Sequence, residues 1–93
     1  MTVTVRLPGA LRDATGGKTK LEANAGTLAE IISDIDRRHP GFRSRVLDDS
    51  GAIRTYVNVY IGDDDARAHG GTRAAVPDGS EVMVIPAMAG GFA

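Results

Sequence analysis

Two adjacent glycines near the end of the chain, Gly90 and Gly91, are the residues best suited to chemistry. A glycine pair costs backbone entropy and adds no side chain to a core. The pair follows a predicted strand, and residues 87–91 can extend about 17 Å beyond the fold at about 3.4 Å per residue. Such a thin tail can thread a narrow channel and present a carboxylate to the active site of another protein.

Other motifs that could do chemistry have plainer explanations. The run Asp63–Asp65 lacks the ligand spacing of a divalent-metal site, and aspartate is common in turns, so we expect a solvated turn. The segment Thr15–Thr19, TGGKT, is similar to the end of a phosphate-binding loop. However, Arg12 stands where that loop needs a glycine, and a strand follows instead of a helix. His39 and His69 are separated in the sequence, in a predicted helix end and a glycine-rich loop.

The composition excludes several classes of function. The chain has no cysteine, which excludes disulfides, thiolate metal sites and a catalytic thiol. No serine lies in a nucleophile motif, so we expect no active site of its own, no stably bound cofactor and no metal. A formal net charge of −1 and few aromatic residues argue against nucleic acid. No signal peptide or membrane-length apolar run is visible, so we expect a cytoplasmic protein that does not bind membranes.

A helix is the element that the sequence predicts most strongly. Thr27 and Glu30 have the spacing of a capping box, in which the two residues exchange hydrogen bonds. The residues of one apolar stripe then follow at i, i+3, i+4 and i+7, namely Leu28, Ile31, Ile32 and Ile35. The segment 39–41, His-Pro-Gly, ends the helix. The arginines beyond this stripe are expected to form a solvated helix end, with docking as the minority alternative; they are Arg37, Arg38, Arg43 and Arg45.

Strands are predicted on both sides of this helix. Alternation of apolar and polar residues indicates strands over 2–7, 18–23, 55–62 and 81–86. A loose helical segment is expected over 42–47, a short strand near 66–68, and turns near 73–76 and 77–79. This order predicts one α+β domain in which a mixed sheet of four to five strands packs on one main helix. If the first and last strands pair centrally, they run parallel.

The sequence resembles the family of β-grasp sulfur-carrier proteins that includes ThiS and MoaD. The family's closing pattern D-G-x-x-V-x-(I/V)-x-P-x-x-A-G-G runs here from Asp78 to Gly91, and the helix TLAEIISDI also fits. The strand VNVYI and the stretch AHGGTRAAVPDGSEV look closest to the CysO-type carriers of cysteine synthesis. The resemblance implies a ubiquitin-like β-grasp domain over residues 1–86 and a flexible C-terminal tail over residues 87–93.

The resemblance also implies a chemistry for the tail. In such carriers an ATP-dependent enzyme of the ubiquitin-activating type adenylates the terminal glycine carboxylate, which is here that of Gly91, next to Gly90. A sulfur donor then displaces AMP and leaves a thiocarboxylate. The ATP belongs to the partner enzyme, which acts as adenylyltransferase and sulfurtransferase. The thiocarboxylate delivers sulfur as a tethered nucleophile at high local concentration.

Phe92 and Ala93, which follow Gly91, depart from the family's pattern. Members that are ready for activation end at the second glycine, whereas the carboxyl of Gly91 is here held in a peptide bond. The resemblance therefore implies a precursor that a zinc-dependent metalloprotease cleaves between Gly91 and Phe92.

The sheet face opposite the helix, near the tail, is the expected docking surface for the activating enzyme. Alternation leaves apolar side chains on this face after the core has been assigned. The expected partner-binding residues are Tyr56, Tyr60, Met83, Ile85, Pro86 and Met88. The alternative is that the loops of the tail cover this face.

Four functions are compatible with the sequence. A carrier for cysteine synthesis would pass sulfur to an aminoacrylate made on a pyridoxal-phosphate cysteine synthase, and this is the function we expect. The small subunit of molybdopterin synthase would insert the same tail into the large subunit of that enzyme. A ubiquitin-like modifier would join Gly91 to lysines of other proteins. A plain interaction domain would make no use of the glycines.

Overall fold

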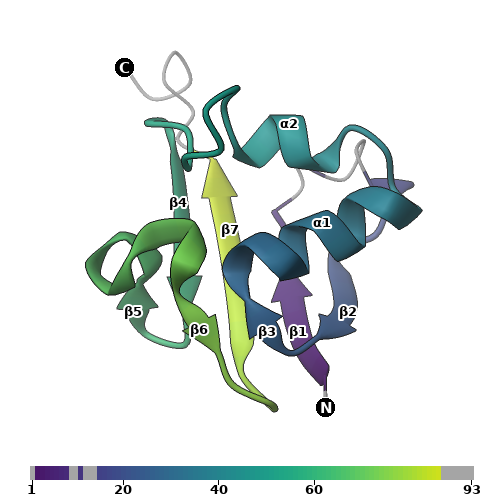
Figure 1. The fold of residues 1–93 in the computed structure, drawn as a ribbon. Coiled ribbons are helices and arrows are strands. Elements are labelled where there is room, and N and C mark those ends of the chain that lie inside the picture. The colour runs from purple at the N-terminus through teal and green to yellow at the C-terminus, as the bar shows by residue number, and fades with distance from the viewer. Residues whose placement is uncertain (1, 9–10, 12–14, 87–93) are drawn as a thin grey trace.

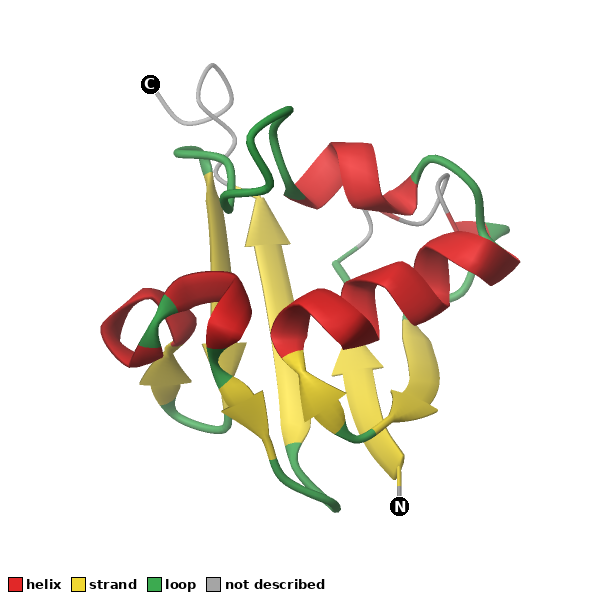
Figure 2. Ribbon diagram, in the orientation of Figure 1, coloured by secondary structure: helices red, strands yellow, loops and turns green. Residues whose placement is uncertain are grey.

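A five-stranded mixed sheet carries its helices on one face (Figures 1 and 2). The structure, a computed structural model, describes residues 2–8, 11 and 15–86. The strands of this sheet are β1 (Thr2–Arg6), β2 (Lys20–Asn24), β4 (Val57–Ile61), β5 (Asp64–Asp65) and β7 (Glu81–Pro86). Their spatial order is β2-β1-β7-β4-β5, and only β1 and β7 run parallel. The predicted parallel pairing of the first and last long strands is therefore confirmed.

The main helix, α1 (Leu28–Arg38), begins at the predicted capping box. The Thr27 hydroxyl accepts the amide of Glu30 at 3.2 Å, and the Glu30 carboxylate accepts the amide of Thr27 at 2.8 Å. That second hydrogen bond stabilises the ionised carboxylate and lowers the pKa of Glu30 below its usual 4.5. The helix ends at His39, as predicted, and a short second helix follows as α2 (Phe42–Val46).

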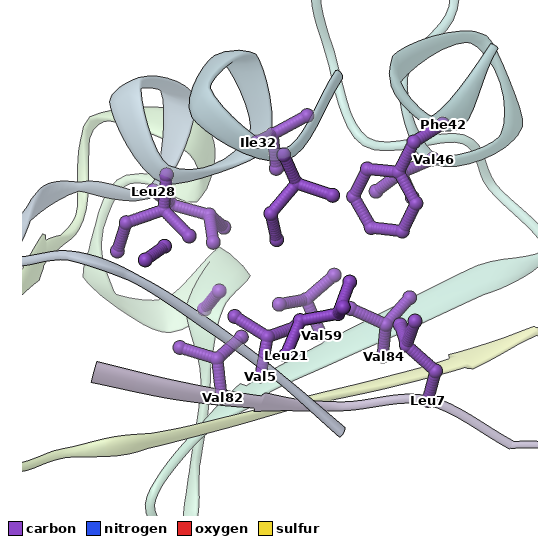
Figure 3. Close-up of a cluster of buried hydrophobic side chains, with 14 of the residues drawn as sticks. Val5, Leu7, Leu21, Leu28, Ile32, Phe42, Val46, Val59, Val82 and Val84 are labelled. Carbon is purple, nitrogen blue, oxygen red and sulfur yellow. The ribbon is translucent and has the colours of Figure 1, made fainter. Parts of the chain in front are cut away.

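The core lies between α1 and the sheet (Figure 3). Every residue of the predicted apolar stripe is buried, because α1 lies across the sheet with that stripe facing the strands. Valines from three strands meet it, since alternate residues of a strand point to one face. These buried valines are Val3 and Val5 of β1, Val57 and Val59 of β4, and Val82 and Val84 of β7. Phe42 and Val46 of α2 close one end of the core.

Two predictions for the segment between β4 and β7 are wrong. The strand expected near Ala66–Ala68 is a 3₁₀-helix, η2 (Ala66–His69), since the Asp65 side chain accepts the amide of Arg67 and caps it. The short strand of this segment is β5, which lies just before η2. The turn expected over 63–65 is formed by Gly62 and Asp63, because Asp64 and Asp65 belong to β5. The turn expected near 73–76 contains a strand instead.

That strand is β6 (Ala75–Val76), which follows the 3₁₀-helix η3 (Gly71–Arg73). It pairs antiparallel with β3 (Gly26–Thr27), immediately before α1 (Figure 1). Leu28 at the start of α1 also donates its amide to the carbonyl of Ala74 at 2.9 Å. This small second sheet therefore fixes the point at which α1 begins.

The TGGKT segment forms a turn, as expected. Thr15 is fully buried, and its hydroxyl donates to the carbonyl of Lys18 at 2.7 Å. Gly16 and Gly17 have positive φ angles, which other residues rarely adopt. This turn leads directly into β2 and does not open a helix.

Candidate docking surface and tail root

The tail begins at the end of β7, the central strand of the sheet. Pro86, the last residue of β7, pairs with Val57 of β4, while Met83 pairs with Arg6 of β1 on the other side. Because β1 and β7 are parallel, the tail begins at the same end of the sheet as the C-terminal end of β1. The predicted tail residues Met88, Gly90, Gly91 and Phe92 lie outside the described residues.

Next to this tail root, an apolar patch lies on the sheet face opposite α1. Met83 and Ile85 are each 37% exposed, and Tyr60 of β4 is the half-buried cross-strand neighbour of Met83. Tyr56 is 47% exposed and lies in the turn before β4. Met83, Ile85 and Tyr60 on this face, together with the exposed Tyr56 of the adjoining turn, are called the docking face below. For Pro86, a further predicted partner-binding residue, the structure describes only its pairing with Val57.

Basic residues border the docking face on the β1 and β2 side. Lys20 pairs with Arg6, which in turn pairs with Met83, so the three residues form one row across the sheet. The Arg6 side chain also forms an ion pair with Glu81 at 2.6 Å, and both side chains remain about half exposed. The apolar patch is therefore bordered by Lys20 and by an Arg6 side chain that is paired with a carboxylate.

A shallow groove joins the basic border to the apolar patch. It has a volume of about 420 Å³. Its lining residues are Arg6, Leu7, Pro8, Thr19, Lys20, Met83 and Ile85. Sequence reasoning missed the first five, although Arg6 has the outward position in the alternating segment TVTVRL. The missing information was the register of β1 against β7, which decides which residues of the two strands are neighbours.

Among residues 2–8, 11 and 15–86, acidic and histidine side chains form no cluster that could bind a metal ion. Asp64 and His69 form an exposed pair at 3.3 Å, away from the tail root. Nor does any helix in these residues have the length and apolar character needed to cross a bilayer. The exposed apolar side chains Met83 and Ile85 lie beside the start of the tail.

Comparisons with known proteins agree with this geometry. The model of the ThiS family matches residues 5–91. The sulfur carrier protein CysO of Mycobacterium tuberculosis is 41% identical over 93 residues, which are 98% of this chain and 100% of that protein. The crystal structure of Mycobacterium tuberculosis CysO superposes with a TM-score of 0.87 and 39% identity, covering 92% of this chain and 99% of that one.

A second solved structure is a BexX/CysO complex from Amycolatopsis orientalis. It superposes with a TM-score of 0.88 and 40% identity, covering 92% of this chain and 96% of that one. These superpositions confirm the predicted β-grasp fold, and the identities confirm the predicted resemblance to CysO. This chain belongs to the ThiS family of ubiquitin-like β-grasp sulfur-carrier proteins.

Proposed function

We propose that this protein carries sulfur for cysteine biosynthesis as a thiocarboxylate on Gly91. The observation that carries the proposal is that the family match extends to Gly91 and so includes the glycine pair beyond β7. The 41% identity to a protein named a sulfur carrier, CysO, favours cysteine biosynthesis over the other pathways that use such a tail. This protein is then a co-substrate of other enzymes and not an enzyme itself.

Activation of the tail takes two steps on a partner of the ubiquitin-activating type. A carboxylate oxygen of Gly91 attacks the α-phosphorus of ATP, and pyrophosphate leaves. Hydrosulfide, or a sulfur donor equivalent to it, then attacks the acyl carbon, and AMP leaves with the bonding electrons of the anhydride. The product is a thiocarboxylate, whose sulfur is the nucleophile passed to a pyridoxal-phosphate cysteine synthase. Glycines at 90 and 91 leave the reacting carbon without a side chain that would crowd the channel.

Cleavage between Gly91 and Phe92 precedes activation in this proposal. The carboxyl of Gly91 forms a peptide bond with Phe92, so its oxygen cannot attack ATP until that bond is hydrolysed. The proposed protease is a zinc-dependent metalloprotease. Cleavage would then decide when the carrier can accept sulfur.

Docking on the activating enzyme uses the docking face in this proposal. Met83 and Ile85 lie only three and one residues before Pro86, so a partner that covers them is next to the start of the tail. Burial of these side chains would contribute favourable free energy, because exposed apolar surface is removed from water. The BexX/CysO complex supports the idea that a protein of this fold engages a partner chain.

The test is ATP–pyrophosphate exchange with the cognate activating enzyme. Three forms are compared: the 93-residue chain, a form that ends at Gly91, and that shorter form with Gly91→Ala. We expect exchange only with the unsubstituted shorter form. Equal exchange with the long chain would contradict the cleavage step, and full exchange with Gly91→Ala would contradict the role of the glycine.

The pathway is tested separately, by intact-mass measurement of protein purified from its native cells and by reconstitution. Replacement of one oxygen by sulfur on Gly91 supports the carrier chemistry. Sulfur transfer to a cysteine synthase supports the proposed pathway, and transfer in a molybdopterin synthase assay would replace it. Adducts on lysines of other proteins, with no sulfur transfer, would indicate a modifier instead.

A further inference from the structure

The turn that precedes β4 holds the most exposed aromatic side chain of the docking face. The amide of Val57 donates to the carbonyl of Arg54 at 2.9 Å and closes a four-residue turn. Tyr56 is the third residue of this turn and is 47% exposed. Val57, the last residue of the turn, is also the strand partner of Pro86. The turn therefore joins the docking face to the tail root.

The Arg67 guanidinium is hydrogen-bonded to both ends of this turn. Its Nη2 donates to the carbonyl of Arg54 at 2.7 Å and to the carbonyl of Val57 at 2.8 Å. Its Nη1 donates to the side-chain oxygen of Asn58 at 3.2 Å. Hydrogen bonds from a charged donor are stronger than neutral ones, and the planar guanidinium fixes their relative directions.

The backbone of Arg67 is itself held in place. Its amide donates to the Asp65 carboxylate at 2.8 Å, and the preceding residue, Ala66, is fully buried at the start of η2. Arg67 thus connects a capped 3₁₀-helix to a turn about ten residues earlier in the chain. These side-chain hydrogen bonds are separate from the backbone pairing of β4 and from the hydrophobic core.

We propose that Arg67 is a positioning residue that acts through Tyr56, by holding the turn 54–57 in the conformation that the activating partner binds. The inference rests on the proposed function, because it assumes that the docking face engages that partner. Loss of the guanidinium removes three side-chain hydrogen bonds at the two ends of the turn. The hydrogen bond from the Val57 amide to the Arg54 carbonyl and the pairing of Val57 with Pro86 remain, so the turn loosens without unfolding. The affinity of docking then falls, whereas the chemistry at Gly91 is unchanged.

The test is a double-mutant cycle in the form that ends at Gly91. The activating enzyme's KM for the carrier and its kcat are measured for Tyr56→Ala, Arg67→Ala and the double variant. We expect Tyr56→Ala to raise KM about tenfold and Arg67→Ala about fivefold, with kcat unchanged. Because Arg67 acts through Tyr56, the double variant is expected to match Tyr56→Ala alone. Arg67→Lys keeps the charge but not the planar fork, so its KM is expected to lie between those of wild type and Arg67→Ala.

Arg37→Ala is the matched control. Arg37 is an exposed arginine whose ion pair, with Asp34 at 2.7 Å, lies on α1. Its substitution is expected to leave KM unchanged. Additive effects of Tyr56→Ala and Arg67→Ala, or an unchanged KM for Arg67→Ala, would overturn the positioning role.

Amide NMR spectra of the full chain give a readout that does not depend on the partner. Arg67→Ala is expected to shift the amides of residues 55–58 and to speed their hydrogen exchange, while the amides of α1 stay unchanged. Unchanged amides at 55–58 would also overturn the inference. If the unsubstituted shorter form is not adenylated at all, the proposed function fails and the docking role fails with it. The NMR result would still decide whether Arg67 fixes the turn.

Discussion

The two faces of β7 differ in burial. Val82 and Val84 are each 1% exposed and pack under α1, whereas Met83 and Ile85, which alternate with them, are each 37% exposed. One strand therefore contributes to the core with one face and to the docking face with the other. Alternation along a strand allows this division without any additional element.

In the proposed function, this difference separates stability from partner recognition. Full burial of a valine or isoleucine side chain contributes about 1.5–3 kcal/mol, so the inner face carries much of the folding free energy. The outer face keeps part of its apolar area exposed after folding, and that area is available for a partner. Substitutions on the two faces are therefore expected to give different kinds of defect.

The largest effect is expected on the inner side. Ile32 of α1 is 2% exposed and faces the sheet, so Ile32→Ala leaves a cavity and should cost about 2–5 kcal/mol of unfolding free energy. The measurement is urea denaturation at equilibrium. Ser33→Ala, at the next and exposed position, is the control and should change stability by less than about 0.5 kcal/mol. A loss of only a few tenths of a kcal/mol for Ile32→Ala would mean that this side chain does not support the core.

The outer face should show the opposite behaviour. Met83→Glu combined with Ile85→Glu is expected to weaken binding to the activating enzyme at least about tenfold, because a partner would have to bury both charges. Unfolding free energy should change by less than about 1 kcal/mol. Titration calorimetry and urea denaturation measure the two quantities.

The control for this pair lies on the same face of the sheet. Thr2→Glu introduces a charge at an exposed position at the far end of β1 and should leave binding unchanged. Unaltered binding of the double glutamate variant would remove the docking face from the proposal.

A smaller effect, at the exposed start of α1, concerns pH. Glu30 stabilises the start of α1 while ionised, and its folded pKa lies below 4.5, chiefly because the backbone amide of Thr27 donates to it. This contribution is complete above the unfolded pKa and is lost as pH falls through the folded pKa. Glu30→Gln keeps a neutral acceptor, so the stability of wild type relative to this variant should fall as pH drops below 4.5. Thermal unfolding of both proteins between pH 7 and pH 3 checks this, and parallel curves would refute it.

The smallest effect is expected at the basic border. The ion pair between Arg6 and Glu81 is about half exposed, so Arg6→Ala should cost at most about 1 kcal/mol, and less at high salt. The same substitution removes one cation beside the docking face and should slow association with an acidic partner. Stopped-flow association at low and high salt measures this. An association rate that does not respond to salt in wild type would mean that the border plays no part in docking.

Periodic signals explain which parts of the fold could be predicted. The stripe of α1 and the alternation in β1, β4 and β7 repeat often enough to be read from the sequence, and so does the spacing of Thr27 and Glu30. A strand of two residues has no period. β3 and β6 form because Gly26 pairs with Val76 and Thr27 pairs with Ala75. These residues are far apart in the sequence, so the pairing can be seen only in the folded chain.

The candidate site shows the same limit. Met83 and Ile85 could be assigned to one exposed face because each has an outward position in the alternating pattern of β7. The exposure of Tyr56 could also be predicted, although this residue lies in the turn before β4 and not in the strand. Arg67 could not be found in this way, since its three acceptors are two carbonyl groups and one amide side chain. Every residue has a backbone carbonyl group, so the sequence does not indicate which carbonyl an arginine side chain will contact. Such contacts can be found only in the three-dimensional structure.

The central place of β7 also has a consequence for synthesis on the ribosome. β7 inserts between β1 and β4, both of which are made earlier, so the pairing of Thr4 with Glu81 must wait until nearly the whole domain has emerged. Contacts between residues so far apart in sequence require closure of a long loop, which makes them late and slow to form. Met83 and Ile85 arrive on this same strand. A nascent chain consequently completes its core and the exposed apolar face of β7 in one event.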